Sequence, residues 1–200
     1  MSDAAQIRAF VAVDLAADVR ERVVRLKAEL AAVRSEARWT RDEGLHATMK
    51  FLGSVELSRL SHVRDAVARA AASVAMFAMR VRGLGAFPSL KRPRVVWVGL
   101  EADGLGELAG TLERELTPLG FPPEARASQP HLTLGRINGA RGWRTLEPIL
   151  HQHESDDFGD SPVDHVTLYR SDLRPGGAVY TALWTSSLSD STRGAHHGIR

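Results

Sequence analysis

The chain has 200 residues and no cysteine, and 44% of its residues are hydrophobic. This length fits one compact domain or two small fused lobes with enough apolar residues for a core. The lack of cysteine excludes disulfides, thiol catalysis and cysteine-ligated zinc. The 26 basic and 24 acidic residues give a net charge of only +2. We therefore expect no extended cationic surface for long nucleic acids, and a small ligand or a nucleic-acid end fits better.

The first half alternates predicted strands and helices. A buried strand is expected over residues 7–15, and an apolar stripe predicts a helix over residues 18–33. A second strand is expected over residues 46–52, with a turn at Gly53. The helix that follows would bury Leu57, Leu60, Val63, Val67 and Ala71.

The second half repeats this order of elements. A Val-Val-Trp-Val strand begins near Arg94, and a helix follows with leucines at positions 105, 108, 112 and 116. After a loop at residues 120–123 come a strand at His131, a helix near residues 141–151 and a closing hairpin over residues 163–184. The predicted fold is α+β, with two lobes built from duplicated, pseudo-twofold βαβ-type units and mostly antiparallel sheets that form a central cleft.

The ends and one internal segment carry further expectations. We expect a single domain over residues 1–188 and a flexible tail over residues 189–200, which lack hydrophobic periodicity. No charged-then-apolar leader and no run of 18 apolar residues occurs, so a cytoplasmic protein outside the membrane is expected. A loop is predicted over residues 83–93, where Phe87 and several cations could border a nucleotide site.

A four-residue pattern occurs in both halves, as His46-Ala47-Thr48-Met49 and His131-Leu132-Thr133-Leu134. Side chains alternate along a strand, so each copy places an imidazole and a hydroxyl on one face. Two imidazoles can supply a base and an acid near neutral pH, because their unperturbed pKa is about 6.5. Hydroxyls can donate hydrogen bonds to phosphoryl oxygens. The pair predicts opening of a phosphodiester without a metal, although a third triplet, His165-Val166-Thr167, competes with either copy.

Several segments resemble the two-histidine phosphoesterases, most closely the RNA 2′,3′-cyclic phosphodiesterases of the LigT or ThpR group, once named 2′-5′ RNA ligases. The segments are residues 7–13, 45–53, 85–89, 94–100 and 130–136. The resemblance extends to residue 184 and includes a last hairpin, matched by residues 168–173 and 176–180, in which the family has no catalytic histidine. The catalytic pair is therefore assigned to His46 and His131, not His165. Met49 departs mildly from the family, which usually has Leu or Ile there.

The resemblance implies hydrolysis of 2′,3′-cyclic phosphates, at RNA or oligonucleotide termini or in cyclic nucleotides, to 2′-phosphates. His46 would be the proton donor and His131 the proton acceptor. Thr48 and Thr133 would bind the non-bridging oxygens. We expect no cofactor, no metal and a monomer. The alternatives are a hydrolase of ADP-ribose cyclic phosphate or of cyclic nucleotides, and a non-catalytic module that binds RNA ends.

Arg136 and Ile137 fit a regular strand poorly. Counting by twos from His131, Arg136 would point into the core and Ile137 into solvent. A β-bulge at Gly135 reverses both side chains and turns Arg136 toward the site. The family's phosphate-contacting arginine has this offset from the second histidine, while the alternative is a surface arginine.

Further candidates have competing interpretations. Lys50 lies four residues after His46, so it would share the face of His46 and contact phosphate, or be a solvated lysine at the end of a strand. Phe51 is predicted to lie in the core. Phe87 would stack on a base or anchor its loop.

One cluster allows a metal site as an alternative to a solvated helix end. It comprises His151, His153, Glu154, Asp156 and Asp157. The solvated helix end is preferred, because no pair of carboxylates accompanies the His-x-Thr strands.

Overall fold

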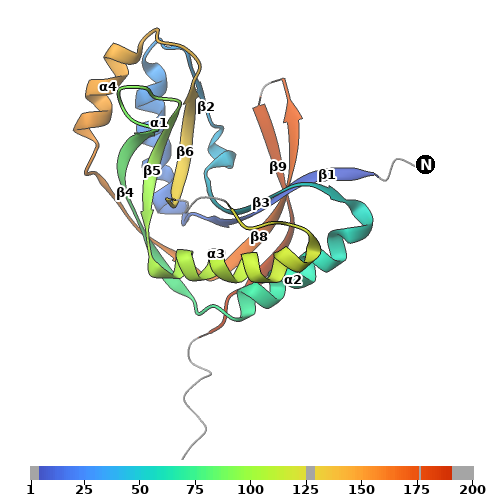
Figure 1. Cartoon of the computed structure of the whole chain (residues 1–200). Helices are drawn as coiled ribbons and strands as arrows, with labels where there is room; N and C mark the ends of the chain where they lie inside the picture. Colours follow the sequence, from blue (N-terminus) through green and yellow to red (C-terminus); the bar gives the residue numbers. More distant parts are fainter. Residues whose placement is uncertain (1–4, 125–128, 176, 191–200) are drawn as a thin grey trace, which may run out of the picture.

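The computed structural model describes residues 5–124, 129–175 and 177–190 and contains two antiparallel sheets (Figure 1). The first sheet has the order β3-β1-β8-β9 and the second the order β2-β6-β5-β4-β7. Strands of the first sheet are β1 (Gln6–Asp14), β3 (His46–Glu56), β8 (His165–Arg174) and β9 (Gly177–Ser187). Strands of the second are β2 (Ala37–Trp39), β4 (Phe77–Phe87), β5 (Val95–Glu101), β6 (His131–Ile137) and β7 (Asp157–Val163). All of these strand pairs are antiparallel, which confirms the predicted fold class.

Helices cover one face of each sheet (Figure 1). Helices α1 (Ala17–Ala32) and α4 (Trp143–Gln152) pack on the second sheet, while α2 (Leu60–Ala72) and α3 (Asp103–Leu116) pack against each other and on the first. Short 3-10 turns occupy Asp42–Gly44, Leu57–Arg59 and Thr117–Leu119. Helix α1 follows a strand of the first sheet yet packs on the second, so the two halves interlock.

Alternation along the strands leaves each sheet with one open face. In β1, Val11 and Val13 join the apolar core beneath the helices, whereas Phe10 and Asp14 lie on the opposite face. The helices supply that core through apolar stripes such as the fully buried Leu105, Leu108, Leu112 and Leu116 of α3. Burying such a side chain contributes about 1.5–3 kcal/mol. The open faces remain for polar and aromatic residues.

The predicted helices are confirmed, but two details of the first half are wrong. Strand β3 does not turn at Gly53; it continues to Glu56, and Gly53 (φ 67°) pairs with Ala9. Leu57 is not buried by α2, because it lies in the preceding 3-10 turn and is 49% exposed.

The predicted loop over residues 83–93 is also wrong in its first part. Residues up to Phe87 belong to β4. Gly83 (φ 72°) has no paired residue on β5, because the register shifts between Arg82 and Leu84. Strands β2, β4 and β7 were not predicted; β2 and β7 lie at the edges of the second sheet.

At the C-terminal end, Ser189, the first residue of the expected tail, is hydrogen-bonded to the folded chain. The amide of Ser189 donates to the carbonyl of Val74, and its carbonyl accepts from Met76. Gly176 of the predicted hairpin and residues 191–200 of the predicted tail lie outside the described residues. Within the described part of the chain, the helices are too short or too polar to cross a membrane.

Candidate active site

The first His-x-Thr copy lies on the open face of the first sheet. His46 opens β3 opposite Asp14 of β1, and Thr48 lies opposite Ala12. The intervening Ala47 is buried in the core, as the alternation predicted. Within the described residues, the hydroxyl of Thr48 has no hydrogen-bond partner, so it is free to bind a ligand.

His46 is half-buried among aromatic rings. Its imidazole stacks on Phe10 with ring centroids 4.7 Å apart, lies 5.7 Å from Tyr169, and meets Tyr180 edge-on at 5.0 Å. Burial disfavours the charged imidazolium and lowers the pKa of His46 to about 4, while Asp14 acts in the opposite direction and Arg20 in the same direction as burial. In the ligand-free protein this histidine is therefore neutral at pH 7.

Asp14 is the acidic neighbour of His46. The phenol of Tyr169 donates to its carboxylate at 2.9 Å from each oxygen, and the hydroxyl of Thr167 lies at 3.5 Å. Arg20 lies 3.7 Å away. Burial and this carboxylate raise the pKa of Tyr169 to about 12. The network holds a negative charge beside the first imidazole.

The second copy lies on the open face of the second sheet. His131 opens β6 opposite Gly99, and Thr133 lies opposite Trp97. The ring of Phe87 meets that of His131 edge-on at 5.0 Å. No hydrogen bond engages the hydroxyl of Thr133 within the described parts of the chain. The arrangement of the first copy is repeated here with different neighbours.

One ring nitrogen of His131 is held by the backbone. Its Nδ1 lies 2.7 Å from the carbonyl oxygen of Gln129. A carbonyl only accepts, so this contact places the hydrogen on Nδ1 and leaves Nε2 with its lone pair available. The neutral ring thus has the tautomer that a general base needs.

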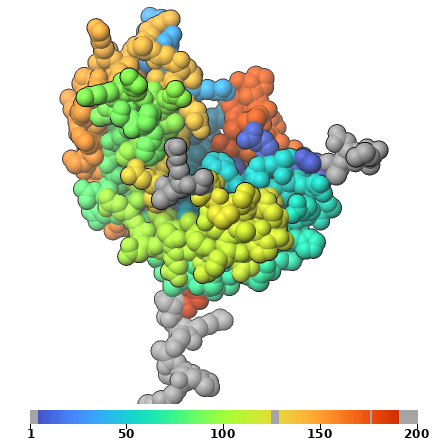
Figure 2. All heavy atoms as spheres, in the orientation of Figure 1, coloured from blue at the N-terminus to red at the C-terminus, as the bar shows by residue number. Residues whose placement is uncertain are grey.

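The strands that carry the two copies lie next to each other in the folded chain. Strands β3 and β6 belong to different sheets, yet they are in contact. A hollow is visible between the green and yellow segments that include β4, β5 and β6 and the red-orange β8–β9 hairpin (Figure 2).

A β-bulge follows the threonine in each copy. In β6 the register skips Leu134 between the pairs Trp97–Thr133 and Val96–Gly135, which confirms the predicted bulge. Arg136 consequently lies exposed on the open face, and Ile137 packs against the core. Gly135 does not have a positive φ. Glycine is needed there because a Cβ would lie 2.7 Å from the ring of Trp39.

The equivalent bulge in β3 was missed and overturns two predictions. The register skips Met49, so the next residue, Lys50, points away from His46. Lys50 is only 2% exposed, and its ammonium donates to the carbonyl of Pro122 at 2.5 Å and lies 3.5 Å from Glu113. Its predicted place on the face of His46 is wrong. Phe51 is instead 64% exposed on that face, beside Phe10, and is not a core residue.

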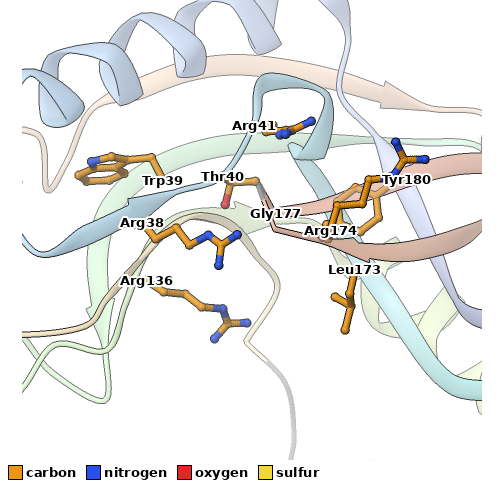
Figure 3. A pocket seen from close by; sticks show the side chains of 10 residues that line it. Arg38, Trp39, Thr40, Arg41, Arg136, Leu173, Arg174, Gly177 and Tyr180 are labelled. Atoms are coloured by element: carbon orange, nitrogen blue, oxygen red, sulfur yellow. The ribbon is translucent and has the colours of Figure 1, made fainter.

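Beside the two copies lies an open groove of about 400 Å³. Strands β2 and β6 form one side and the β8–β9 hairpin the other (Figure 3). Among the described residues, its lining holds four arginines and no carboxylate; it includes Arg38, Thr40, Arg41, Arg136, Arg174 and Tyr180. We call this feature the arginine groove. This local gathering of cations was not predicted, because the net charge is a sum over the chain and does not report how the cations are distributed.

The remaining candidates lie in other surroundings. His165 opens β8, where its ring contacts Asp164, while Thr167 is 2% exposed and its hydroxyl faces Asp14 and Thr185. This triplet thus lacks an available hydroxyl.

The ring of Phe87 lies beside two other rings. It stacks on Trp97 with ring centroids 5.0 Å apart and meets His131 edge-on.

The side chains of the cluster after α4 pair with one another or with residues of other elements. His153 contacts Asp156 at 2.5 Å and Glu29 at 3.7 Å. The hydrogen bond with Asp156 raises the pKa of His153. Across the described ranges, no group of three or more His, Cys, Asp or Glu side chains is arranged to hold a metal.

Several site residues were not identified from the sequence. Asp14 ends the first strand. Alternation of side chains along that strand would have placed Asp14 on the same face as Phe10. The misfit argument that placed Arg136 does not identify Phe51, because Lys50 and Phe51 both fit a regular strand. Arg38 and Arg174 lie far from both motifs, and no local pattern indicates them.

Comparison with known proteins agrees with this architecture. The model of the family described as LigT like phosphoesterase matches twice, over residues 13–97 and 98–180. The RNA 2′,3′-cyclic phosphodiesterase of Methanothermobacter thermautotrophicus is 34% identical over 177 residues, which is 88% of this chain and 96% of that protein.

Solved structures share the fold. The Thermus thermophilus protein TT0787 superposes with a TM-score of 0.80 and 30% identity, covering 92% of this chain and all of that one. E. coli LigT in complex with 3′-AMP gives a TM-score of 0.74 and 25% identity, covering 93% of this chain and all of that one. With two consecutive family matches and a relative that aligns over most of its length, the chain belongs to the LigT-like phosphoesterase family.

Proposed function

We propose that the protein is an RNA 2′,3′-cyclic phosphodiesterase, which hydrolyses RNA or nucleoside 2′,3′-cyclic phosphates to 2′-phosphates. The observation that carries the proposal is the contact between β3 and β6, each with an imidazole and a threonine hydroxyl on its open face. The name of the Methanothermobacter relative supports this substrate class. The enzyme acts in the cytoplasm as a monomer.

His131 acts as the general base. Its Nε2 takes a proton from water while the water oxygen attacks phosphorus. The contact between Nδ1 and the carbonyl of Gln129 supports this role, because it orients the ring and fixes the tautomer.

His46 acts as the general acid and protonates the departing O3′ as the P–O3′ bond breaks. With a pKa of about 4, the ring must gain its proton when substrate binds. The anionic cyclic phosphate supplies a negative charge beside the ring, and an opposite charge within about 4–6 Å raises the pKa of a histidine. Asp14 acts in the same direction. Substrate binding and protonation of His46 are therefore coupled.

The remaining site residues stabilise the transition state. Thr48 and Thr133 donate hydrogen bonds to the two non-bridging oxygens, and Arg136 adds a positive charge that acts most strongly on the pentacoordinate state. Phe87 borders the nucleotide beside His131. The reaction needs no metal, because the two histidines supply both proton transfers.

Incubation with 2′,3′-cyclic AMP in the presence of EDTA tests the proposal. The expected product is 2′-AMP, formed at the same rate with and without EDTA. Activity that EDTA abolishes and a divalent ion restores would contradict the acid–base mechanism. Formation of 3′-AMP alone would reverse the assigned leaving group, and binding without turnover would identify a non-catalytic module.

A further inference from the structure

We propose that the arginine groove binds the backbone phosphates of the nucleotides that precede the cyclic end, so that the enzyme prefers oligonucleotides to mononucleotides. This inference rests on the proposed function and specifies its substrate class. It assigns a role to Arg38 and Arg174, which belong to neither His-x-Thr copy.

The arginines reach the groove from separate segments. Arg38 of β2 lies directly opposite Arg136 of β6 in the register, and Arg174 ends β8 on the facing hairpin. Figure 3 shows the guanidinium groups of Arg38 and Arg136 one above the other, directed into the same space. Like charges on neighbouring strands repel each other, and a bound anion would relieve that repulsion.

These guanidinium groups are not neutralised by the protein. Some exposed arginines elsewhere pair with carboxylates, such as Arg69 with Glu115 at 2.8 Å and Arg141 with Glu36 at 3.1 Å. Within the described part of the chain, Arg38, Arg136 and Arg174 have no carboxylate partner within 4 Å, and Arg38 makes only a 3.4 Å contact to the carbonyl of Pro175. They are available to bind phosphate, which matches the planar, bidentate geometry of guanidinium.

The groove is continuous with the proposed catalytic site. Tyr180 lines it and meets the ring of His46 edge-on. Arg136 lies on the same strand and the same open face as His131. A cyclic phosphate held between the histidines would thus leave its preceding nucleotide at the groove. The volume of about 400 Å³ falls in the usual range for small-ligand sites, enough for about one nucleotide.

Contacts of this kind are independent of base sequence. Guanidinium groups bind the phosphodiester, which every nucleotide carries, and each neutralised phosphate of a single strand contributes about −0.7 to the slope of log K against log salt concentration. The groove therefore predicts that affinity depends more strongly on salt for oligonucleotides than for mononucleotides.

The test compares two substrates, 2′,3′-cyclic AMP and a six-nucleotide RNA that ends in a 2′,3′-cyclic phosphate. In the double variant Arg38→Gln/Arg174→Gln, the ratio of kcat/KM for the RNA to kcat/KM for the mononucleotide should fall about tenfold. The slope of log affinity against log salt for the RNA should decrease in magnitude by about 0.7, the contribution of the one phosphate that the groove has room for. The matched control is Arg25→Gln, an exposed arginine of α1 that does not line the groove.

A modified substrate tests whether the preference for RNA depends on the charge of an internucleotide phosphate. Replacing the last internucleotide phosphate of the RNA by an uncharged methylphosphonate should weaken its binding to the wild-type protein, and should have little further effect on the double variant. An unchanged substrate ratio, or a mononucleotide reaction that falls as much as the RNA reaction, would overturn the groove assignment. Absence of turnover on both substrates in the wild-type protein would instead contradict the proposed function.

Discussion

The two His-x-Thr strands have the same backbone but different neighbours. Each begins with its histidine, continues to a threonine on the same face and then bulges, at Met49 in β3 and at Leu134 in β6. The residue opposite the histidine differs, being Asp14 in the first sheet and Gly99 in the second. The two strands therefore share their backbone geometry, whereas the chemical environment of each imidazole depends on its neighbouring residues.

Packing explains why the second site has no carboxylate at this place. A Cβ on Gly99 would lie 2.7 Å from the carbonyl oxygen of Arg82, so the position holds only glycine without a shift of backbone. His131 is oriented instead by the carbonyl of Gln129. One histidine has a charged neighbour and the other a neutral acceptor, which suits an acid and a base respectively.

Removing either imidazole should produce the largest effect. His46→Ala and His131→Ala should each lower kcat by about 10²-fold or more, because general acid and general base catalysis each contribute that much. His165→Ala, the control from the third triplet, should leave kcat within a few-fold. Steady-state rates on 2′,3′-cyclic AMP decide this, and a loss at His165 equal to the others would show that the wrong pair was chosen.

His46 and His153 should contribute with opposite sign to the pH dependence of the free energy of unfolding. Its folded pKa of about 4 lies below the ordinary 6.5, so the unfolded chain binds more protons between these values. The free energy of unfolding should therefore fall as the pH decreases from 6.5 to 4, by up to about 3 kcal/mol from this group. The raised pKa of His153 acts with the opposite sign, since its contribution is lost as the pH rises above 6.5.

Urea denaturation at several pH values measures this difference. The free energy of unfolding of the wild-type protein minus that of His46→Gln isolates the contribution of His46. This difference should increase as the pH rises from 4 to 6.5. A difference that does not vary with pH would show that the ring is not held neutral by burial.

Arg136 has no cationic counterpart in the first copy, where Phe51 occupies the same place after the bulge. Arg136→Ala should weaken binding of the 2′-phosphate product by ~1.5–3 kcal/mol, the usual strength of a hydrogen bond to a charged group, and should slow turnover. The melting temperature should barely change. By contrast, Gly135→Val should also lower stability, because its side chain would collide with Trp39. Calorimetric titration with 2′-AMP that finds normal affinity in Arg136→Ala would place the arginine outside the site.

The smallest expected effect concerns Asp14, the residue that most clearly distinguishes the two copies. Asp14→Asn removes a charge that raises the pKa of His46. The acid should then lose its proton at lower pH, so the alkaline limb of the kcat profile should shift to lower pH, by about one unit or less. Leu57→Gln, an exposed position outside the site, is the control. A limb that stays in place, or moves to higher pH, would show that Asp14 does not support the acid.

The sequence by itself determined the local features of this protein. Hydrophobic periodicity predicted the helices, and strict alternation placed each histidine and threonine on one face, because these patterns depend only on the geometry of a single element. The bulge in β6 was also predictable, since Arg136 and Ile137 both misfit a regular strand. In β3 no residue misfits, because Lys50 and Phe51 are each plausible on either face, and the equivalent bulge was missed.

Only the tertiary structure decided the features that depend on distant segments. The low pKa of His46 arises from burial among rings contributed by β1, β8 and β9, and the arginine groove gathers cations from β2, β6 and the β8–β9 hairpin. A net charge of +2 and a residue list report neither effect. Electrostatic interactions depend on distance and solvent exposure, and both are properties of the folded chain.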